Sequence, residues 1–220
     1  MDGNFYQLEL LSELEAEGRL LCRTAVPFHL KSFDPLERLA EAAEMKAKYN
    51  GDMVWSGYVK MFIDGVIEGR TALMLQPYPG TTDNCGDAVF EADHFNKACT
   101  AIDAMGLQIV VHAIGDGGVR RTLDAYEVAR KINGARDSRH RIEHLECMHV
   151  DDIPRIAELG AVASIQPGHA PFGGMFPPEG LPKYIHNHQI AGCYPWQQIR
   201  AAGAPVIFAT FWPVIGVEVM

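Results

Sequence analysis

Apolar and polar positions follow a repeating order along the chain: a short continuous apolar run, a polar or glycine-containing junction, then a stretch with apolar residues at helical spacing. This order is typical of alternating β-strands and α-helices. Several of the apolar runs have no polar face, which favours parallel strands covered by helices over half-exposed antiparallel strands. The pattern predicts six strands, at Leu20–Val26, Met53–Ile63, Leu107–Ile114, Arg141–Leu145, Ala161–Ile165 and Val206–Ala209.

Start and stop signals mark the helices between these runs. Asp34 stands before a proline and a helical apolar pattern, so we predict a helix that the Asp34 side chain caps. Another helix is expected after Asp93, with Gly106 as the left-handed residue at its end. The run Gly115-Asp116-Gly117-Gly118 is interpreted as a tight strand-to-helix turn capped by Asp116, with a phosphate cradle as the alternative. Gly160 and Gly203 are expected to end two further helices.

Two architectures use this alternation, an open doubly wound sheet and a (β/α) barrel. No GxGxxG fingerprint follows an early strand, whereas the polar candidates fall at strand ends, where a barrel carries its chemistry. A complete barrel takes about 250 residues, so we predict an α/β fold, a TIM-type barrel with about six of its eight βα units. No linker interrupts it, which indicates a single partial barrel domain over residues 1–220. The irregular stretch Gly168–Cys193 is expected to be a functional loop.

The net charge and the cysteine content limit which classes of binding partner and which kinds of cysteine site are expected. The chain has 28 acidic and 19 basic residues and a net charge of −9, without any Lys/Arg run, which argues against nucleic-acid or membrane binding and favours a small-molecule substrate. No apolar stretch approaches the roughly 20 residues of a membrane span, and no leader pattern opens the chain, so a cytoplasmic protein is expected. The five cysteines lack metal-site spacing, and neither a disulfide framework nor a cysteine-built metal site is indicated.

Three titratable side chains interrupt otherwise apolar strand segments: Lys60, His112 and His144. Each alone would be a core residue with satisfied hydrogen bonds, but three at the ends of successive strands converge on one cavity in a barrel. Neutral imidazoles are common zinc ligands. A buried lysine with a lowered pKa can react with carbon dioxide to give an anionic carbamate that bridges metals. The pattern therefore predicts a site for a divalent metal, with zinc as the first choice.

Several motifs, in this order, resemble those of the YtcJ-like branch of the amidohydrolase superfamily. They are Val59–Gly65, Arg70-Thr71-Ala72, Pro77-Tyr78, His112–Asp116, Arg141–His144, Ser164–Pro167 and Trp212-Pro213-Val214. The resemblance implies a (β/α)₈ barrel flanked by a small β-sandwich, one or two divalent metals, often zinc, and hydrolysis of carbon–nitrogen bonds in amides or formamides. By position, Lys60 matches the strand-four lysine that can be carboxylated, while His112 and His144 match the metal ligands of strands five and six.

The chain also departs from the family pattern. Family members carry a His-x-His pair at the end of the first barrel strand, and none precedes Lys60 here. Phe211 stands where the family has a metal-binding aspartate, and phenylalanine neither binds a hard cation nor accepts a proton. The pair in His186-Asn187-His188 is interpreted as an ordinary polar loop, with a substitute ligand pair as the alternative.

Other residues near strand ends receive structural interpretations. Tyr78, His169 and Trp212 are expected to be packing or loop residues, with pocket lining as the alternative, and Arg141 is expected to pair with Glu143.

Two functions remain open. The first is a metal-dependent hydrolase acting on non-peptide carbon–nitrogen bonds. The second is a non-catalytic truncated barrel fragment or subunit that lacks the His-x-His and aspartate ligands. In either case an incomplete parallel sheet exposes its edges, so self-association is expected, with instability in isolation as the alternative.

Overall fold

The computed structural model describes residues 3–171, 173 and 181–210. Its main feature is one six-stranded sheet in which every described pair of neighbours is parallel. The strands, in spatial order, are β2 (Phe28–His29), β4 (Tyr58–Phe62), β5 (Gln108–Ala113), β6 (Arg141–His144), β7 (Val162–Ile165) and β8 (Val206–Phe208). Because the spatial order is also the chain order, the sheet follows the path of a barrel and not that of a doubly wound fold.

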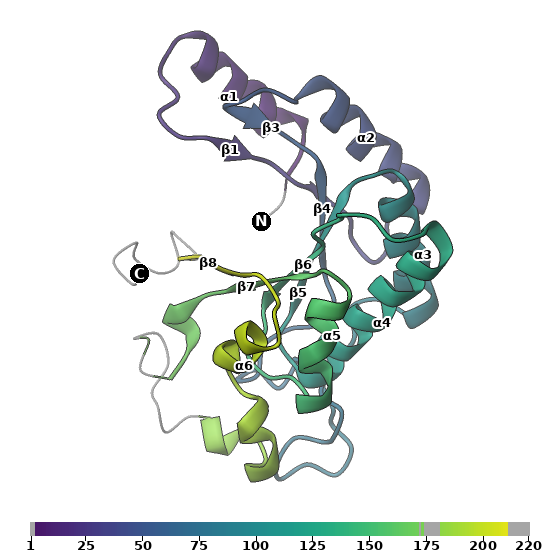
Figure 1. Cartoon of the computed structure of the whole chain (residues 1–220), viewed down its shortest axis with the longest axis vertical. Helices are drawn as coiled ribbons and strands as arrows, with labels where there is room; N and C mark the ends of the chain where they lie inside the picture. The colour runs from purple at the N-terminus through teal and green to yellow at the C-terminus, as the bar shows by residue number, and fades with distance from the viewer. Residues whose placement is uncertain (1–2, 172, 174–180, 211–220) are drawn as a thin grey trace.

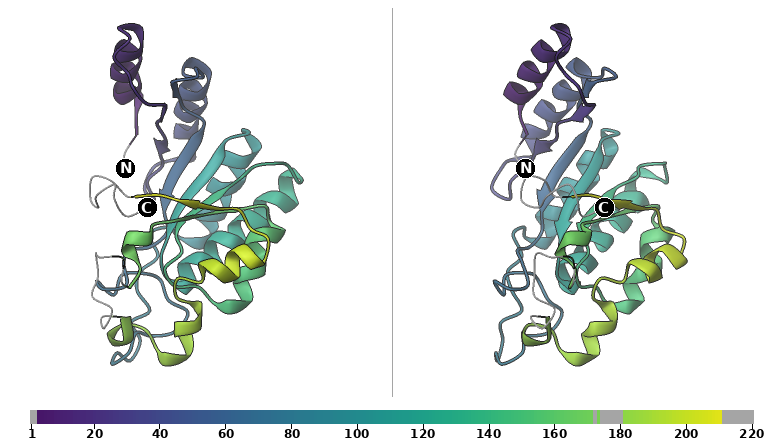
Figure 2. Two further views of the ribbon diagram at one scale, coloured as in Figure 1. Left: turned by 60° about the vertical axis from the view of Figure 1, so that its left-hand side comes forward. Right: turned by 90° about the vertical axis from the view of Figure 1, so that its left-hand side faces the viewer.

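Helices connect the successive strands of this sheet and lie along one side of it (Figures 1 and 2). They are α2 (Leu39–Lys48), α3 (Ala92–Ala104), α4 (Asp116–Asn133), α5 (Ile153–Glu158) and α6 (Trp196–Ala201). Before them, α1 (Phe5–Ala16) packs near a separate two-stranded parallel sheet of β1 (Thr24–Ala25) and β3 (Val54–Trp55). Short 3₁₀ turns cover Leu36–Arg38, Val150–Asp152, Pro167–His169, Leu181–Lys183 and Asn187–Gly192. No helix in the described ranges is long and apolar enough to cross a membrane.

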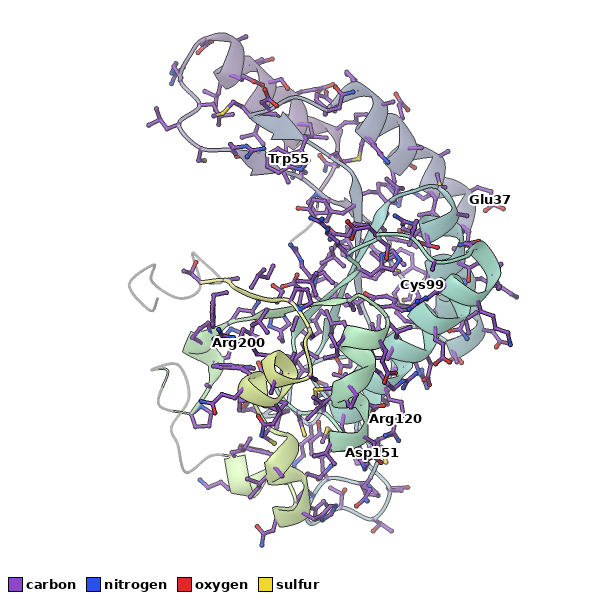
Figure 3. The ribbon with its side chains drawn as sticks, viewed as in Figure 1. Glu37, Trp55, Cys99, Arg120, Asp151 and Arg200 are labelled. Atoms are coloured by element: carbon purple, nitrogen blue, oxygen red, sulfur yellow. The ribbon has the colours of Figure 1, made fainter. Side chains whose placement is uncertain are left out.

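The core lies between the sheet and these helices. Val59, Met61 and Val111 alternate with residues of the opposite sheet face and are fully buried in the same apolar cluster as Phe95 of α3. Cys99, labelled in Figure 3, is fully buried in the same layer. The two outer strands, β2 and β8, have no further neighbouring strand in the described chain. The barrel is therefore incomplete, as the sequence predicts.

Two strand predictions need correction. The segment 20–26 was expected to give the first strand of the sheet, but only Thr24–Ala25 is a strand and it pairs with β3. The first strand of the main sheet is instead Phe28–His29. The segment 53–63 is also two strands, because the Ser56 N–H donates to Tyr49 O (2.9 Å) and its hydroxyl donates to Val26 O (2.8 Å), away from the main ladder.

Both predicted caps are wrong, because other donors take the two carboxylates: local ones at Asp34 and distant ones at Asp116. Asp34 accepts from the Lys31 N–H (2.9 Å) and pairs with Arg38 (2.8 Å), and makes no cap bond to the helix that follows. Asp116 accepts from the Leu75 N–H (2.8 Å) and from the Gln189 side chain (2.9 Å).

The predicted helix-ending glycines are confirmed. Gly106, Gly160 and Gly203 have φ of 66°, 66° and 91°, a region in which a side chain would be strained.

Candidate metal centre

The three sequence candidates come from three adjacent strands, and the structure brings them to one end of the sheet. In the register, Phe62 of β4 lies opposite His112 of β5, and Ala113 lies opposite His144 of β6. The His112 and His144 rings are 4.5 Å apart between centroids. The Lys60 ammonium lies 4.5 Å from the centre of the Phe62 ring, which in turn is 5.0 Å from the His112 ring. The polar side chains therefore gather on the face of the sheet that the helices leave uncovered.

The end of β6 has an unusual backbone that places His144 there. Neighbouring residues of a regular strand point to opposite faces. However, Glu143 pairs with Arg141 (2.5 Å) on the same side of the sheet on which His144 meets His112. The backbone allows this because His144 and Leu145 have φ of 79° and 53°, which is rare for residues with a side chain. Such strain concentrates at functional sites.

Both imidazoles are held neutral. Burial lowers the pKa of His112 to about 4 and that of His144 well below its usual value, and the positive charge of Lys60 adds to both shifts. His112 Nε2 lies 2.9 Å from Gly65 O, which can only accept, so this nitrogen carries the proton. Nδ1 is then the basic atom that His112 offers to a metal.

Lys60 has the chemistry that carbamate formation requires. Burial lowers its pKa to about 8, against the opposing influence of the Glu143 carboxylate. A substantial fraction of the amine is therefore unprotonated near pH 8 and able to act as a nucleophile.

Asp64 holds the loops around these residues in place. Its buried carboxylate accepts from the N–H groups of Ile114 (3.1 Å), Gly115 (2.8 Å) and Leu73 (3.0 Å). Burial outweighs these bonds and raises its pKa to about 7. The same carboxylate also lies close to the His112 ring, with 3.7 Å between Asp64 Oδ1 and His112 Nε2.

Sequence reasoning missed one member of the site, Glu146, and interpreted another, His169, as a packing or loop residue, with pocket lining as the alternative. With His144 they form a buried group whose potential ligand atoms all lie within 4.8 Å of one another. His169 Nδ1 lies 2.8 Å from Glu146 Oε1, so this nitrogen donates to the carboxylate and Nε2 becomes the basic atom. The His144 and His169 rings stack at 5.4 Å. His169 was visible near a strand end, but nothing in the sequence indicates that it meets Glu146.

This donor set fits a divalent metal. Two imidazoles and one carboxylate are a ligand set of catalytic zinc sites, in which the metal keeps an open position. The carboxylate also orients His169, as carboxylates beside metal-binding histidines do.

The other residues singled out from the sequence either have structural roles or lie outside the residues that the structure describes. His186 Nε2 lies 2.9 Å from Pro77 O, and its ring stacks on that of His188 at 5.5 Å, away from the group around His144. Tyr78 is buried and its hydroxyl donates to Ala72 O (2.8 Å), which is a packing role. The Arg141–Glu143 ion pair is present as predicted. Phe211 and Trp212 lie outside the described residues.

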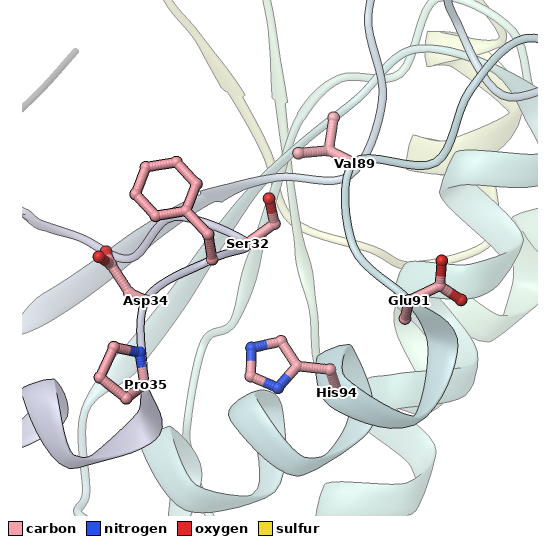
Figure 4. Close-up of a pocket in the computed structure, with 7 residues that line it drawn as sticks. Ser32, Asp34, Pro35, Val89, Glu91 and His94 are labelled. Atoms are coloured by element: carbon pink, nitrogen blue, oxygen red, sulfur yellow. The ribbon is translucent and has the colours of Figure 1, made fainter.

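Two cavities adjoin this end of the sheet. One, of about 220 Å³, is lined by His29 and Phe62, next to His112. The other, of about 420 Å³, has His94 and Glu91 across from Asp34 and Pro35 (Figure 4). Ser32, Phe33 and Val89 line both cavities, which together form one groove beside Phe62.

Comparisons with known proteins give the family and the fold of the chain. The model of the Amidohydrolase family matches residues 1–216. "Protein LONG AFTER FAR-RED 3" of Arabidopsis thaliana is 28% identical over 93% of this chain and 34% of its own length. "Putative amidohydrolase YtcJ" of Bacillus subtilis is 29% identical over 69% of this chain and 27% of its own. A crystal structure of an uncharacterized metal-dependent hydrolase from Pyrococcus furiosus superposes with a TM-score of 0.80 at 27% identity, covering 99% of this chain and 43% of that one. The chain thus spans about a third of the length of these curated relatives.

Proposed function

The chain belongs to the amidohydrolase family, and we propose that it carries part of the active site of a metal-dependent hydrolase acting on carbon–nitrogen bonds of small, non-peptide amides or formamides. The observation that carries the proposal is the convergence of His112 and His144 from adjacent strands, with the Glu146–His169 pair beside them. The groove that starts at Phe62 offers room for a small substrate.

We propose zinc as the metal, on the strength of the donor set. Neutral His112 and His144 supply nitrogen donors, and Glu146 and His169 complete a mixed nitrogen and oxygen set. Lys60 would join this set as a carbamate, formed when its neutral amine adds to carbon dioxide and loses a proton.

A bound divalent metal supplies two things to such a site: a bound water that ionises near neutral pH and a polarised substrate carbonyl. The protein's own residues prepare the site for it. Gly65 O fixes the His112 ring and its tautomer, and Glu146 holds the proton on His169 Nδ1. The Tyr194 hydroxyl donates to His169 O (3.1 Å) and keeps the segment that carries His169 against the site.

A second candidate is a non-catalytic barrel segment. It is favoured by the open sheet, whose edge strands β2 and β8 lack neighbours within the described residues. It is also favoured by the sequence at Phe211, where the family aspartate is replaced.

Metal content separates the two candidates. The purified chain is incubated with zinc, dialysed, and its metal measured by inductively coupled plasma mass spectrometry. We expect retention of about one zinc per chain, with loss of retention in His112→Ala and in His144→Ala. His149→Ala, a change at a more exposed imidazole, serves as the matched control and is expected to keep the metal. A folded wild-type chain that binds no more zinc than the His112→Ala and His144→Ala variants would support the non-catalytic candidate.

The open edges also motivate a proposal on assembly. β2 and β8 are the outer strands of the described sheet, and an edge strand can pair with another chain, so we propose that the isolated chain self-associates. Size-exclusion chromatography with light scattering tests this, and a stable, dispersed monomer would contradict it.

A further inference from the structure

Cys147 and Cys193 meet beside the candidate metal centre, although they are 46 residues apart in the chain. Cys147 follows the end of β6, and Cys193 follows the 3₁₀ turn at Asn187–Gly192. Their sulfur atoms lie 3.6 Å apart with both thiols reduced. We propose that these two cysteines are a redox modification site, which a peroxide converts into an intramolecular disulfide.

The backbone around the pair is already arranged for a disulfide. Cys147 and Cys193 form an antiparallel β-bridge. The Met148 N–H donates to Gly192 O (2.8 Å) and the Tyr194 N–H donates to Glu146 O (2.8 Å), so the bridge bonds flank the cysteine pair and do not join it directly. Two residues in such a non-hydrogen-bonded pair typically have their Cα atoms about 4.5 Å apart, within the range of about 4.4–6.8 Å that disulfides span. Bond formation therefore needs side-chain rotation and little backbone movement.

The two thiols differ in access, which gives the oxidation an order. Cys193 is only partly buried, whereas Cys147 is fully buried. Cys193 is thus the thiol that a peroxide meets first, and Cys147 is the resolving thiol.

The chemistry balances with hydrogen peroxide as the oxidant. The Cys193 sulfur attacks one peroxide oxygen, the O–O bond breaks, and a sulfenic acid and one water form. The Cys147 sulfur then attacks the Cys193 sulfur and displaces the hydroxyl group as a second water. Both sulfurs are oxidised, both peroxide oxygens are reduced, and the two thiol protons end in the two waters.

The proposed disulfide would affect the candidate metal centre because the two cysteines lie next to residues of that site. The disulfide would tie the segment that carries Glu146 to the segment that carries Tyr194. The Tyr194 hydroxyl is 3.5 Å from Glu146 Oε2 and donates to His169 O. Oxidation would thus fix the loops around the Glu146–His169 pair, whether or not the chain is catalytic.

Peptide mapping of the wild-type chain tests the proposal without a variant. The reduced, folded chain is treated with hydrogen peroxide, alkylated under denaturing conditions, digested and analysed by mass spectrometry. We expect the loss of two of the five thiols and one linked peptide pair that contains Cys147 and Cys193. The link should disappear on reduction with dithiothreitol.

Two variants sharpen the result. Cys193→Ser should prevent the loss of the Cys147 thiol, whereas Cys22→Ser, a change at an exposed cysteine, should leave the linked pair unchanged. The proposal is overturned if the wild-type chain oxidises mainly to other pairs, to chains linked through Cys22, or to sulfinic acid at Cys193 while Cys147 stays alkylatable. Circular dichroism before oxidation confirms that each variant is folded.

Discussion

A buried histidine at the start of β6 makes the stability of the chain depend on pH. His140 is 6% exposed, and its Nδ1 accepts from the Ile109 N–H (3.1 Å) while Nε2 lies 3.0 Å from Asp103 Oδ1. Burial lowers the pKa of His140 to about 4, although the charge of Asp103 acts in the opposite direction. The imidazole is therefore neutral in the folded chain over a pH range in which it is protonated in the unfolded chain.

The sign and size of the effect follow from proton linkage. Between pH 6.5 and about 4 the unfolded chain binds a proton at His140 that the folded chain does not, so the free energy of unfolding falls as the pH falls. Each unit of pKa difference corresponds to about 1.4 kcal/mol, which gives a loss of about 3 kcal/mol over this window. Above pH 6.5 the contribution is constant.

Asp103 extends the loss of unfolding free energy to lower pH. Burial pushes its pKa upwards, but hydrogen bonds from Asn133 (2.9 Å) and Arg136 (2.7 Å) outweigh it and hold the pKa below the usual range. A carboxyl group whose pKa is lowered by folding stabilises the chain above its unfolded pKa, and this contribution disappears as the pH falls through the folded value.

Urea denaturation of the wild-type chain and of His140→Gln, from pH 7.5 to 4, isolates the histidine. Glutamine does not titrate, and its amide keeps an acceptor for the Ile109 N–H and a donor for Asp103. Buried groups that do not contact His140, including Asp64 with its raised pKa, titrate in both chains and cancel in the difference. We expect the difference in unfolding free energy to change by about 3 kcal/mol across the window. Parallel pH profiles for the two chains would refute the reasoning.

Two further changes test the packing around the sheet. Gly115→Ala should destabilise the chain by about 2 kcal/mol or more, because a Cβ there would lie 2.1 Å from Leu73 O, a backbone atom that cannot move away freely. Gly57→Ala, where a Cβ meets nothing within 4 Å, is the control in the same urea titration. Tyr126→Phe removes a buried hydroxyl that donates to Arg141 O (2.9 Å) and should cost about 1–2 kcal/mol, measured as a lower urea midpoint at constant slope.

The sequence predicts the fold best where the strands are long and apolar. The strand within 107–114 was located because a mostly apolar run belongs to a strand buried on both faces, and the shorter segments 141–145 and 161–165 were located although polar residues interrupt them. Phe28–His29 was missed because two residues, one of them a histidine, carry no periodicity. Its place in the sheet is set by pairing with β4, which no local pattern reveals.

The cap predictions show the same limit for polar residues. Asp116 stands at the start of α4, where a local interpretation makes it a cap. In the folded chain Leu75 and Gln189, from distant segments, supply its hydrogen bonds. Which donor reaches a carboxylate is a tertiary property, and the same holds for Glu146 and His169, whose contact spans 23 residues.

The strained backbone at the end of β6 carries His144 of the candidate metal centre and leads directly to Cys147 of the proposed disulfide. Left-handed backbone at a residue with a side chain costs about 1–3 kcal/mol, and His144 and Leu145 both adopt it. Glycine would relieve the strain at position 144 but would remove an imidazole that lies 4.5 Å from that of His112. The surroundings hold the strained segment, since the Leu145 N–H donates to Ala113 O (3.2 Å) and the Cys147 N–H donates to Ile114 O (2.9 Å). Ending a strand does not require this strained conformation. The strain therefore indicates that the position of the His144 side chain matters to the function of the protein.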